Sequence, residues 1–342
     1  MQNFLSFKIS AKVHETTEAC TFELESESGQ SLHYESGQFL TLVFETAFGE
    51  KRRSYSFSSS PFEHKVCITV KKVDNGEFSR ALIDRYQVGD SVFSAGVGGQ
   101  FTLHAAEQAE QVFFLAAGSG ITPCFAMIKE LLQTTSKQVV LYYSNKSKRD
   151  IIFYDALEAL RSKYAQRFQI RYFNSDAELF SERRLSHYLL PQLLQADVKV
   201  LDAKVMCYLC GPFEYMQMAE IALRSRFTPN QIRKEQFDGR ERTWSPKPPD
   251  TEKHKVHLSW QGEERVVEAG YPQSILQSAL KAGIVLPYSC SAGRCGACIA
   301  TCVRGKVWMA YNEVLTDKEV ENGRFLTCQA YPQEGEIWVE IE

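Results

Sequence analysis

The spacing of hydrophobic residues changes twice along the chain. Up to about residue 106, short stretches such as 39–44 and 66–73 alternate between apolar and polar residues, with Gly, Ser and Asn turns between them. This alternation is typical of half-buried strands that are joined by short turns. We therefore expect residues 1–106 to form a small antiparallel β-barrel.

A second pattern begins at about residue 107. An apolar run over 112–117 leads into a glycine turn, a helix-like stretch covers 124–132, and a second apolar run covers 138–143. Strands that alternate with helices indicate a parallel sheet. Residues 107–238 are therefore predicted to form an α/β domain.

The third pattern follows a segment with few apolar side chains that could be buried. Residues 239–253 contain three prolines and many charged residues, so they are predicted to form an exposed, semi-stiff linker. Residues 254–342 then begin with a hairpin pattern around Gln261-Gly262. Farther on, Thr316 and Glu319 form a capping box for a short helix. This last region is expected to be a smaller α+β domain.

Composition limits the kinds of partner. With 342 residues, 44% of them hydrophobic, the chain can build two or three cores. A net charge of −3 gives no basic field for nucleic acid, so none is expected as a partner. The sequence contains no run of about 18 apolar residues, so no membrane span is expected. Ten cysteines without an export-signal pattern at the start favour a reducing cytoplasm.

Four cysteines near the end of the sequence form a motif. Cys290, Cys295 and Cys298 are separated by four and then two residues, and Cys328 follows in a separate segment. This is the spacing of plant-type [2Fe-2S] ferredoxins. The residues between the first three are mostly small, which lets backbone N–H groups approach the sulfur atoms. We therefore expect these four cysteines to hold a [2Fe-2S] cluster.

Two other interpretations of these cysteines remain open at this point. A structural zinc site also uses four cysteines, but usually as two CxxC pairs, and only one CxxC is present here. A set of buried free thiols is the other alternative, which the close spacing of Cys290, Cys295 and Cys298 disfavours. Cys302 fits neither motif and is interpreted as a packing thiol.

A possible flavin motif lies on a predicted strand of the first domain. In the segment 53–56, strand alternation sends Arg53 and Tyr55 to one face and Ser56 to the other. A guanidinium can clamp a pyrophosphate, and an aromatic ring can cover an isoalloxazine. An isolated match could equally be a packed tyrosine beside a surface arginine. The segment 76–79, a glycine turn that enters a short helix, favours the phosphate-binding interpretation.

Two glycine turns in the second domain point to a nucleotide. The segment 118–123 follows a predicted strand and opens a predicted helix, and the segment 210–212 lies between another strand and helix. Glycines let the backbone approach phosphates at a helix N-terminus. Either turn alone could be an ordinary tight connection. Because both end parallel strands, we expect them side by side at the carboxyl edge of the sheet.

The residues after the second strand bear on the choice of coenzyme. Lys146 and Arg149 lie there, with no acidic residue before Asp150. A basic side chain at this place suits a ribose 2′-phosphate, whereas an acidic one suits a 2′-hydroxyl. NADPH is therefore expected, with NADH as the alternative. The residues could also form a solvated basic loop.

Taken together, the flavin and nucleotide motifs resemble the ferredoxin-NADP reductase superfamily. The resemblance implies that Arg53, Gly76 and Ser79 bind the pyrophosphate of FAD and that Ser54 and Phe78 line the same site. It implies that Tyr55, Ser56 and Cys210 position the flavin and nicotinamide rings for hydride transfer. The remaining residues that it assigns to the pyridine nucleotide are Gly118, Ser119, Gly120, Thr122, Pro123, Gly211 and Pro212, besides Lys146 and Arg149.

The order of the domains resembles the reductase components of bacterial multicomponent oxygenases, with the closest likeness to the phenylacetyl-CoA epoxidase reductase. It implies an FAD barrel, an α/β NAD(P) domain and a C-terminal ferredoxin-like (β-grasp) domain. It also implies an NAD(P)H-dependent oxidoreductase that passes electrons from NADPH through FAD and [2Fe-2S] to a redox protein acceptor, an oxygenase component. The alternatives are a stand-alone ferredoxin or flavodoxin-type reductase, a reductase of a small molecule, and a carrier without catalysis.

Overall fold

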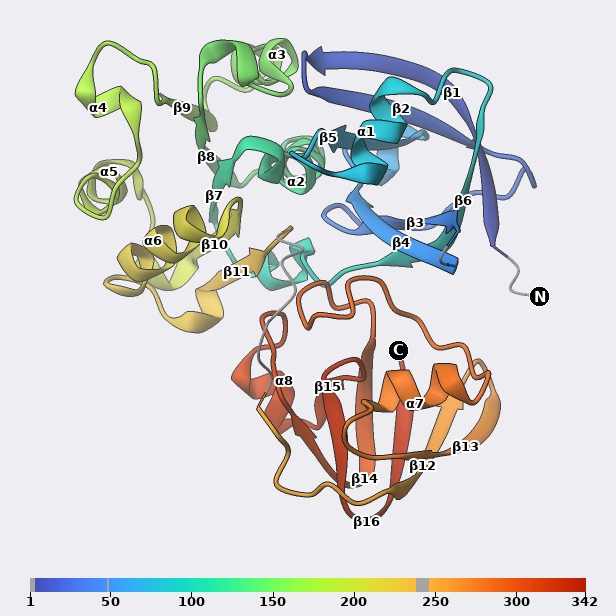
Figure 1. Cartoon of the computed structure of the whole chain (residues 1–342). Helices are drawn as coiled ribbons and strands as arrows, with labels where there is room; N and C mark the ends of the chain where they lie inside the picture. The colour runs from blue at the N-terminus through green and yellow to red at the C-terminus, as the bar shows by residue number, and fades with distance from the viewer. Residues whose placement is uncertain (1–3, 48, 238–245) are drawn as a thin grey trace. The chain divides into compact units, whose positions relative to one another are not determined.

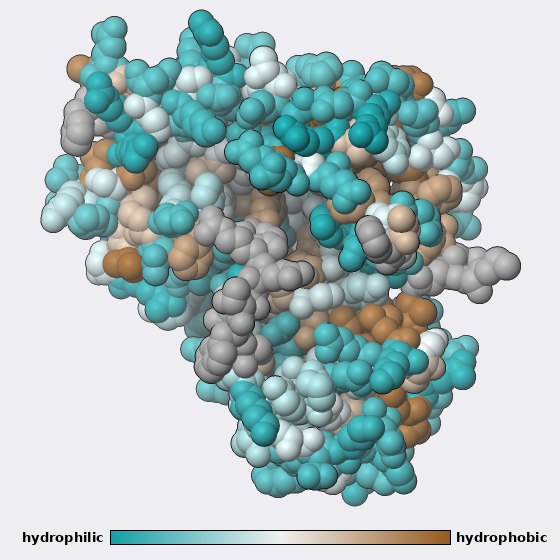
Figure 2. Space-filling view, in the orientation of Figure 1, coloured by the Kyte–Doolittle hydropathy of each residue, from teal (hydrophilic) through white to brown (hydrophobic). Residues whose placement is uncertain are grey.

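The computed structural model describes residues 4–47, 49–237 and 246–342 (Figure 1). The chain divides into two compact units, Met1–Asp238 and Gly239–Glu342. Residues 238–245, most of which belong to the expected linker, lie outside the described part of the chain. On the face shown in Figure 2, hydrophilic side chains cover most of the surface of each unit.

The first part of the larger unit is an antiparallel sheet with strand order β4-β3-β6-β1-β2-β5. A bridge between Phe57 and Ile68 joins the two edge strands, so the sheet closes into a barrel. One helix, α1 (Glu77–Asp84), lies between β5 and β6 in the chain. The strands are β1 (Leu5–Thr16), β2 (Ala19–Ser26), β3 (Phe39–Thr46), β4 (Gly49–Ser56), β5 (Val66–Lys71) and β6 (Ser91–Gly98).

The second part of this unit is a five-stranded parallel sheet with order β11-β10-β7-β8-β9. Apolar side chains of α2 and α3 pack on one face of the sheet, and those of α5 and α6 pack on the other. The strands are β7 (Gln111–Ala117), β8 (Gln138–Asn145), β9 (Phe168–Asn174), β10 (Val205–Cys210) and β11 (Ile232–Glu235). The helices are α2 (Ile121–Thr134), α3 (Tyr154–Lys163), α4 (Phe180–Arg183), α5 (Leu189–Asp197) and α6 (Phe213–Arg224).

A hydrogen bond and an ion pair connect the barrel to helix α2 of the nucleotide part. The Ser60 hydroxyl donates a hydrogen bond to the carbonyl of Ala126, and Lys129 forms an ion pair with Glu63. Both side chains of that ion pair are largely covered, which makes the contact less sensitive to screening by solvent. These contacts fix the end of the flavin strand relative to the parallel sheet.

The smaller unit is a mixed five-stranded sheet with order β13-β12-β16-β14-β15, in which only β12 and β16 run parallel. Helix α7 packs its buried side chains into the core of the sheet, as in a β-grasp fold. Short 3-10 turns occur in the larger unit at Pro61–Glu63, Leu103–Ala106, Gly118–Gly120, Lys148–Asp150, Asp202–Lys204 and Pro229–Gln231. The elements of the smaller unit are β12 (His254–Trp260), β13 (Glu263–Ala269), α7 (Ile275–Lys281), β14 (Ile299–Met309), α8 (Asp317–Glu321), β15 (Arg324–Leu326) and β16 (Ala330–Ile341).

Several local expectations hold in this unit, and one does not. Gln261 and Gly262 both have positive φ in the turn between β12 and β13, and Thr316 with Glu319 caps α8. In contrast, the described end of the linker is not simply exposed. Pro248 is buried, and the Asp250 carboxylate accepts hydrogen bonds from the backbone N–H groups of Glu252 and Glu334. These bonds hold the segment against the sheet, which the proline and charge content did not reveal.

The helices of the described residues include none with the length and apolar content needed to cross a membrane.

Candidate functional site

The predicted flavin strand is β4, and its side chains alternate as expected. Arg53 is exposed, and its guanidinium lies over the ring of Phe78 at 4.9 Å from the ring centre. Tyr55 is half-buried among the apolar side chains of the barrel, while Ser56 is buried. The Ser54 hydroxyl lies 3.2 Å from the hydroxyl of Thr41 on β3. The strand therefore presents a cation, an aromatic ring and a hydroxyl within one short segment.

The predicted phosphate turn opens helix α1. Gly76 is the residue before the helix, and its N–H donates to the Val73 carbonyl at 2.8 Å. The buried Ser79 hydroxyl accepts a bond from the Val73 N–H at 3.2 Å. A Cβ on Gly76 would lie only 2.6 Å from this hydroxyl oxygen, so the turn requires glycine. Ser79 thus secures the loop that leads into the helix.

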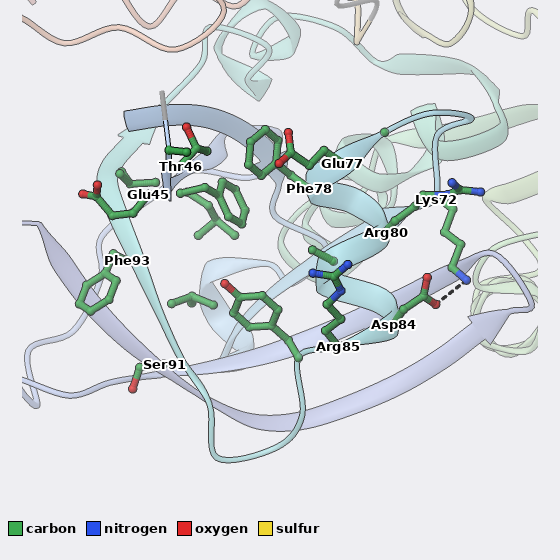
Figure 3. Close-up of a pocket in the computed structure, with 18 of the residues that line it drawn as sticks. Glu45, Thr46, Lys72, Glu77, Phe78, Arg80, Asp84, Arg85, Ser91 and Phe93 are labelled. Carbon is green, nitrogen blue, oxygen red and sulfur yellow. Dashed lines mark ion pairs between the residues drawn. The ribbon is translucent and has the colours of Figure 1, made fainter. Parts of the chain in front are cut away.

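A cavity of about 1030 Å³ lies beside α1 and is also lined by residues of β3 and β6 (Figure 3). Gly76 and Phe78 line it, which places part of the predicted flavin set at its wall. Its lining combines aromatic rings with basic side chains, and Lys72 pairs with Asp84 at 2.6 Å among them. Aromatic and basic groups around a space of this size suit a flavin nucleotide with its phosphates. The residues present therefore fit FAD.

The two predicted nucleotide turns lie in contact. Strands β7 and β10 are neighbours, with Ala116 opposite Cys210. A Cβ on Gly120 would lie 2.1 Å from the Cys210 carbonyl oxygen, and a Cβ on Gly211 would lie 3.0 Å from the Cβ of Ala117. The two backbones can therefore approach this closely only because both residues are glycines.

The remaining residues of these turns stabilise the starts of two helices. The Thr122 hydroxyl donates to the Ser119 carbonyl at 2.9 Å, and Pro123 lies in the first turn of α2. Pro212 precedes α6, with Gly211 directly before it. Both helices thus direct their N-terminal N–H groups towards the same edge of the sheet, where they favour an anion.

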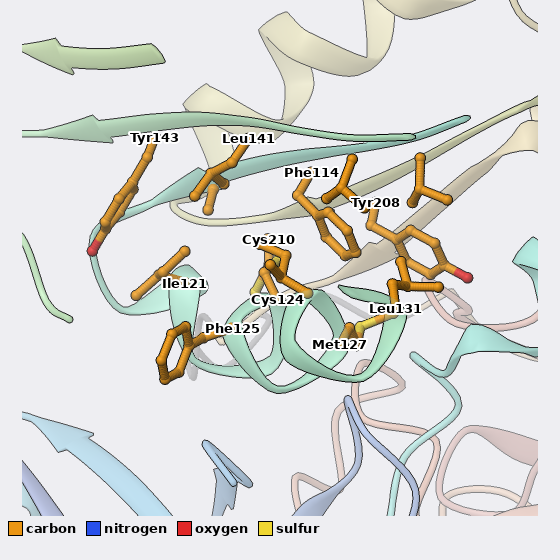
Figure 4. Close-up of a cluster of buried hydrophobic side chains, with 14 of the residues drawn as sticks. Phe114, Ile121, Cys124, Phe125, Met127, Leu131, Leu141, Tyr143, Tyr208 and Cys210 are labelled. Carbon is orange, nitrogen blue, oxygen red and sulfur yellow. The ribbon is translucent and has the colours of Figure 1, made fainter. Parts of the chain in front are cut away.

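Cys210 lies inside the protein and has no exposed surface. Figure 4 shows it beside Cys124 of helix α2, in the core on that face of the sheet. Burial and then the nearby Glu235 carboxyl raise the pKa of the Cys210 thiol well above its usual range. The thiol is therefore neutral, and it forms part of the floor beneath the two turns.

The sequence motifs did not identify Glu235 as a site residue. It is the last residue of β11 and lies opposite Cys210 in the sheet. Burial raises the pKa of this carboxyl to about 8, and the facing Ser56 hydroxyl lowers the pKa slightly. Neither Ser56 Oγ nor Glu235 Oε2 has a hydrogen bond of good geometry within the described structure. The buried Ser56 hydroxyl of the flavin strand and the buried Glu235 carboxyl of the nucleotide sheet thus face each other, and both can still form hydrogen bonds with a ligand.

Lys71 was also missed. It ends β5 of the barrel, and its ammonium lies 3.8 Å from the place that a Cβ on Gly118 would take. A cation beside a glycine turn adds positive potential where phosphates could bind. The signal available in the sequence was weak, because a lysine at the end of a strand is usually a solvated surface residue.

The basic residues after β8 are accessible. Lys146 and Arg149 are both exposed. Asp150, the first acid in this segment, accepts a hydrogen bond from the Ser147 hydroxyl at 2.7 Å. The nearest carboxylate is therefore engaged locally, while the two cations remain open to a ligand.

The four predicted cluster ligands interact in two pairs. Cys290 shares a hydrogen bond with Cys295, and Cys298 shares one with Cys328. Within the described residues, no three His, Cys, Asp or Glu side chains surround a single ion-sized point. Two thiol pairs match a two-iron cluster, in which each iron takes two cysteine sulfurs. This donor arrangement fits [2Fe-2S] better than one tetrahedral zinc ion.

Backbone N–H groups also approach these sulfurs. The Ala292 N–H donates to Cys290 Sγ at 3.3 Å, and the Cys290 N–H donates to Cys295 Sγ at 3.5 Å. The Cys295 thiol and the backbone N–H groups together lower the pKa of the Cys290 thiol below its usual value, although burial opposes them. Cys290 is exposed, whereas Cys298 and Cys328 are buried, so one pair lies near the surface. Such N–H groups stabilise the negative charge of a bound cluster.

Cys302 does not join this group. Its side chain is half-buried on β14, and its thiol donates to the Arg304 carbonyl at 3.6 Å. The structure therefore agrees with its interpretation as a packing thiol.

Models of three known families match the chain in order. The oxidoreductase FAD-binding domain matches residues 6–103, the oxidoreductase NAD-binding domain matches 114–220, and the 2Fe-2S iron-sulfur cluster binding domain matches 258–333. These matches confirm the expected three folds and the three cofactors, FAD, a pyridine nucleotide and [2Fe-2S].

Curated relatives match over almost their whole length. The ferredoxin reductase component of 3-ketosteroid-9-alpha-monooxygenase from Mycobacterium tuberculosis is 32% identical, covering 99% of this chain and 96% of that protein. A 1,2-phenylacetyl-CoA epoxidase subunit from Escherichia coli is 30% identical, covering 100% of this chain and 99% of that protein. The solved structure of phthalate dioxygenase reductase covers 99% of this chain and 98% of its own, with a TM-score of 0.63 at 23% identity, and shares the fold. The chain is therefore an oxidoreductase that belongs to the family of ferredoxin reductase components of oxygenases.

Proposed function

We propose that this protein takes electrons from NADPH and delivers them singly to a separate oxygenase component. The observation that carries this proposal is the meeting of Ser56, at the end of the flavin strand, with Glu235, which lies opposite Cys210 in the nucleotide sheet. A flavin held by the barrel and a nicotinamide held by the sheet would meet at this point. When bound, the flavin supplies the conversion between the nicotinamide's electron pair and the single electrons that [2Fe-2S] accepts.

On the flavin side, we assign Arg53 and the N–H groups that follow Gly76 to the pyrophosphate. Phe78 and Ser54 support this region, and Ser79 maintains the loop geometry. Tyr55 covers the flavin ring, and Ser56 hydrogen-bonds its edge. The cavity beside α1 receives the adenosine half, because its rings can stack on adenine.

On the nucleotide side, the turn at Gly118–Gly120, with Thr122 and Pro123 at the helix start, receives the pyrophosphate, and Lys71 adds a positive charge. Cys210, with Gly211 and Pro212, forms the floor below the nicotinamide. Glu235 carries its proton at neutral pH because its pKa is about 8. It can therefore donate a hydrogen bond to Ser56 Oγ or to a bound ring.

Cys290, Cys295, Cys298 and Cys328 are assigned to the cluster. The exposed position of Cys290 gives the cluster an edge from which an electron can pass to another protein. The names of the relatives support an oxygenase component as that acceptor. We place the protein in the cytoplasm, where a reducing environment keeps its ten cysteines as thiols.

The choice of coenzyme can be tested at Lys146 and Arg149. The double variant K146A/R149A should lower kcat/KM for NADPH by roughly tenfold or more, since charge-assisted hydrogen bonds to the 2′-phosphate are lost. The kcat/KM for NADH should change less than twofold. Steady-state ferricyanide reduction measures both. A wild-type preference for NADH would contradict the NADPH assignment.

The acceptor can be tested by isolating a tagged form of the protein from its own cells. Recovery of oxygenase subunits that turn over with NADPH in the isolated complex would support the proposal. Rapid turnover with a quinone or a ferric complex, without any oxygenase activity, would favour the small-molecule reductase instead.

A further inference from the structure

Tyr143 has a hydroxyl that joins two segments at the nucleotide edge of the sheet. The residue lies near the carboxyl end of β8, next to Ala116 of β7, and its side chain is fully buried. Its hydroxyl donates to the Gly118 carbonyl at 3.0 Å and accepts from the Ile152 N–H at 3.2 Å. Figure 4 shows the ring at the margin of the core, near the start of α2.

The first of these segments is the glycine turn itself. Gly118 has a positive φ of 54°, a conformation that glycine adopts without steric cost but does not prefer strongly. No side-chain cap is present on the 3-10 turn that begins at Gly118. Within the turn, the backbone N–H of Ile121 donates to the Gly118 carbonyl, and the Tyr143 hydroxyl adds a side-chain donor to the same carbonyl from outside the turn.

The second segment packs on the helix that the turn begins. Phe153, directly after Ile152, has a positive φ of 62°, and its ring stacks on Phe125 of α2 with centres 4.3 Å apart. The turn, helix α2 and the segment 151–153 thus form a closed set of contacts. The Tyr143 hydroxyl joins the turn directly to Ile152.

The hydroxyl remains a donor throughout the working range of pH. Burial raises the pKa of Tyr143 far above its ordinary value, so the group does not ionise. Loss of the hydroxyl would leave the Gly118 carbonyl with the Ile121 N–H but without the Tyr143 donor, and the Ile152 N–H without this acceptor, so the turn would be held less firmly.

We propose that Tyr143 is a positioning residue, which holds the Gly118 turn in the conformation that receives the pyrophosphate of the pyridine nucleotide. This inference rests on the proposed function, because it requires that the turn binds the nucleotide. Tyr143 touches neither reacting ring, and its effect is expected in binding rather than in hydride transfer.

The test is the variant Y143F, with Y142F as its matched control. Tyr142 is the adjacent residue, is equally buried, and donates its hydroxyl to Asp197 at 2.8 Å in the core on the opposite face. Each variant loses one hydroxyl and its hydrogen bonding, so each should lower the Tm by about 2–4 °C. Y143F should also raise the KM for NADPH and the Kd for NADP⁺ about fivefold, with kcat within twofold. Y142F should change none of these three values.

A fall in Tm for Y143F without a rise in KM or Kd would overturn the proposal, because Tyr143 would then be a stabilising residue only. The same holds if Y142F raises KM as much as Y143F does. The visible flavin spectrum shows whether each variant retains its fold and its FAD.

A third variant separates failure of this inference from failure of the proposed function. S119D places a carboxylate in the turn and should raise the KM for NADPH more than Y143F does, by repulsion of the pyrophosphate. If S119D leaves KM unchanged, the turn does not bind the nucleotide and that assignment is wrong. If S119D raises KM and Y143F does not, only the role of Tyr143 is wrong.

Discussion

The cluster loop and the site around Ser56 differ in how much of the fold is needed to assemble them. Three of the four cysteines proposed to hold the cluster lie within the single loop 290–298, and the sulfurs of Cys290 and Cys295 accept hydrogen bonds from N–H groups of that same loop. Ser56, Cys210 and Glu235 come instead from the ends of three strands in two different sheets. Their meeting depends on the packing of the barrel against helix α2.

This difference has a physical consequence for substitutions. A change to a proposed cluster ligand would remove a bond to the metal. Cys298 and Cys328 also belong to the core of the domain, but the rest of that core would remain in place. A change at the second site alters a buried polar contact, whose free energy also depends on the packing of both sheets. Effects at the cluster should therefore be large and local. The effects of substitutions at Ser56 and Glu235 should be smaller, and those at Glu235 should depend on pH.

The largest expected effect comes from C298S. Loss of one thiolate should remove the cluster, so that iron and sulfide fall to background and cytochrome c reduction falls by roughly 100-fold. Ferricyanide reduction with NADPH should persist, because the larger unit is unchanged. Iron analysis and both assays measure this outcome. The control C302S should keep its iron and sulfide, and their loss from C302S would show that the ligands are misassigned.

A smaller effect is expected for S56A. Removal of the hydroxyl should slow flavin reduction by NADPH about tenfold, since a hydrogen bond at the flavin edge is lost. Stopped-flow absorbance measures the rate, and the cluster spectrum should not change. If flavin reduction proceeds at the wild-type rate, Ser56 has no part in positioning the rings.

The smallest effect concerns the pH dependence of stability and the variant E235Q. The pKa of Glu235 rises from an ordinary 4.5 to about 8 on folding, because the carboxyl is buried. Between these values the folded state binds one more proton than the unfolded state, so stability falls as pH increases. This group contributes a slope of about 1.4 kcal/mol per pH unit, which levels off above pH 8.

Urea unfolding of the wild type and E235Q at pH 6, 7 and 8 measures this slope. The variant should lose stability with pH less steeply than the wild type. Equal slopes would mean that Glu235 ionises normally and does not carry a proton at neutral pH.

The sequence predicted those features that depend on residues close together in the chain. Cys290–Cys298 and the two glycine turns could be predicted because spacing and residue type carry the information. The contact between Gly120 and Cys210 followed from the rule that parallel strands share one ligand-binding edge.

Other features depended on contacts that no local pattern encodes. Glu235 lies on a short strand with mixed residues, and it becomes a buried acid only when β10 and the barrel cover it. Tyr143 and Tyr142 are indistinguishable by propensity, yet their hydroxyls bond to opposite sides of the sheet. Similarly, the Asp250 carboxylate accepts a hydrogen bond from the backbone N–H of Glu334, which is far away in the sequence.

The most direct test is the anaerobic addition of NADPH to the purified protein, followed by absorbance and electron paramagnetic resonance. The protein should contain one FAD, two irons and two sulfides. Absorbance from both the flavin and the cluster should decrease, and the signal of a reduced [2Fe-2S] cluster should develop. Zinc in place of iron and sulfide, or a cluster that stays oxidised while the flavin is reduced, would contradict the relay from NADPH through FAD to the four cysteines.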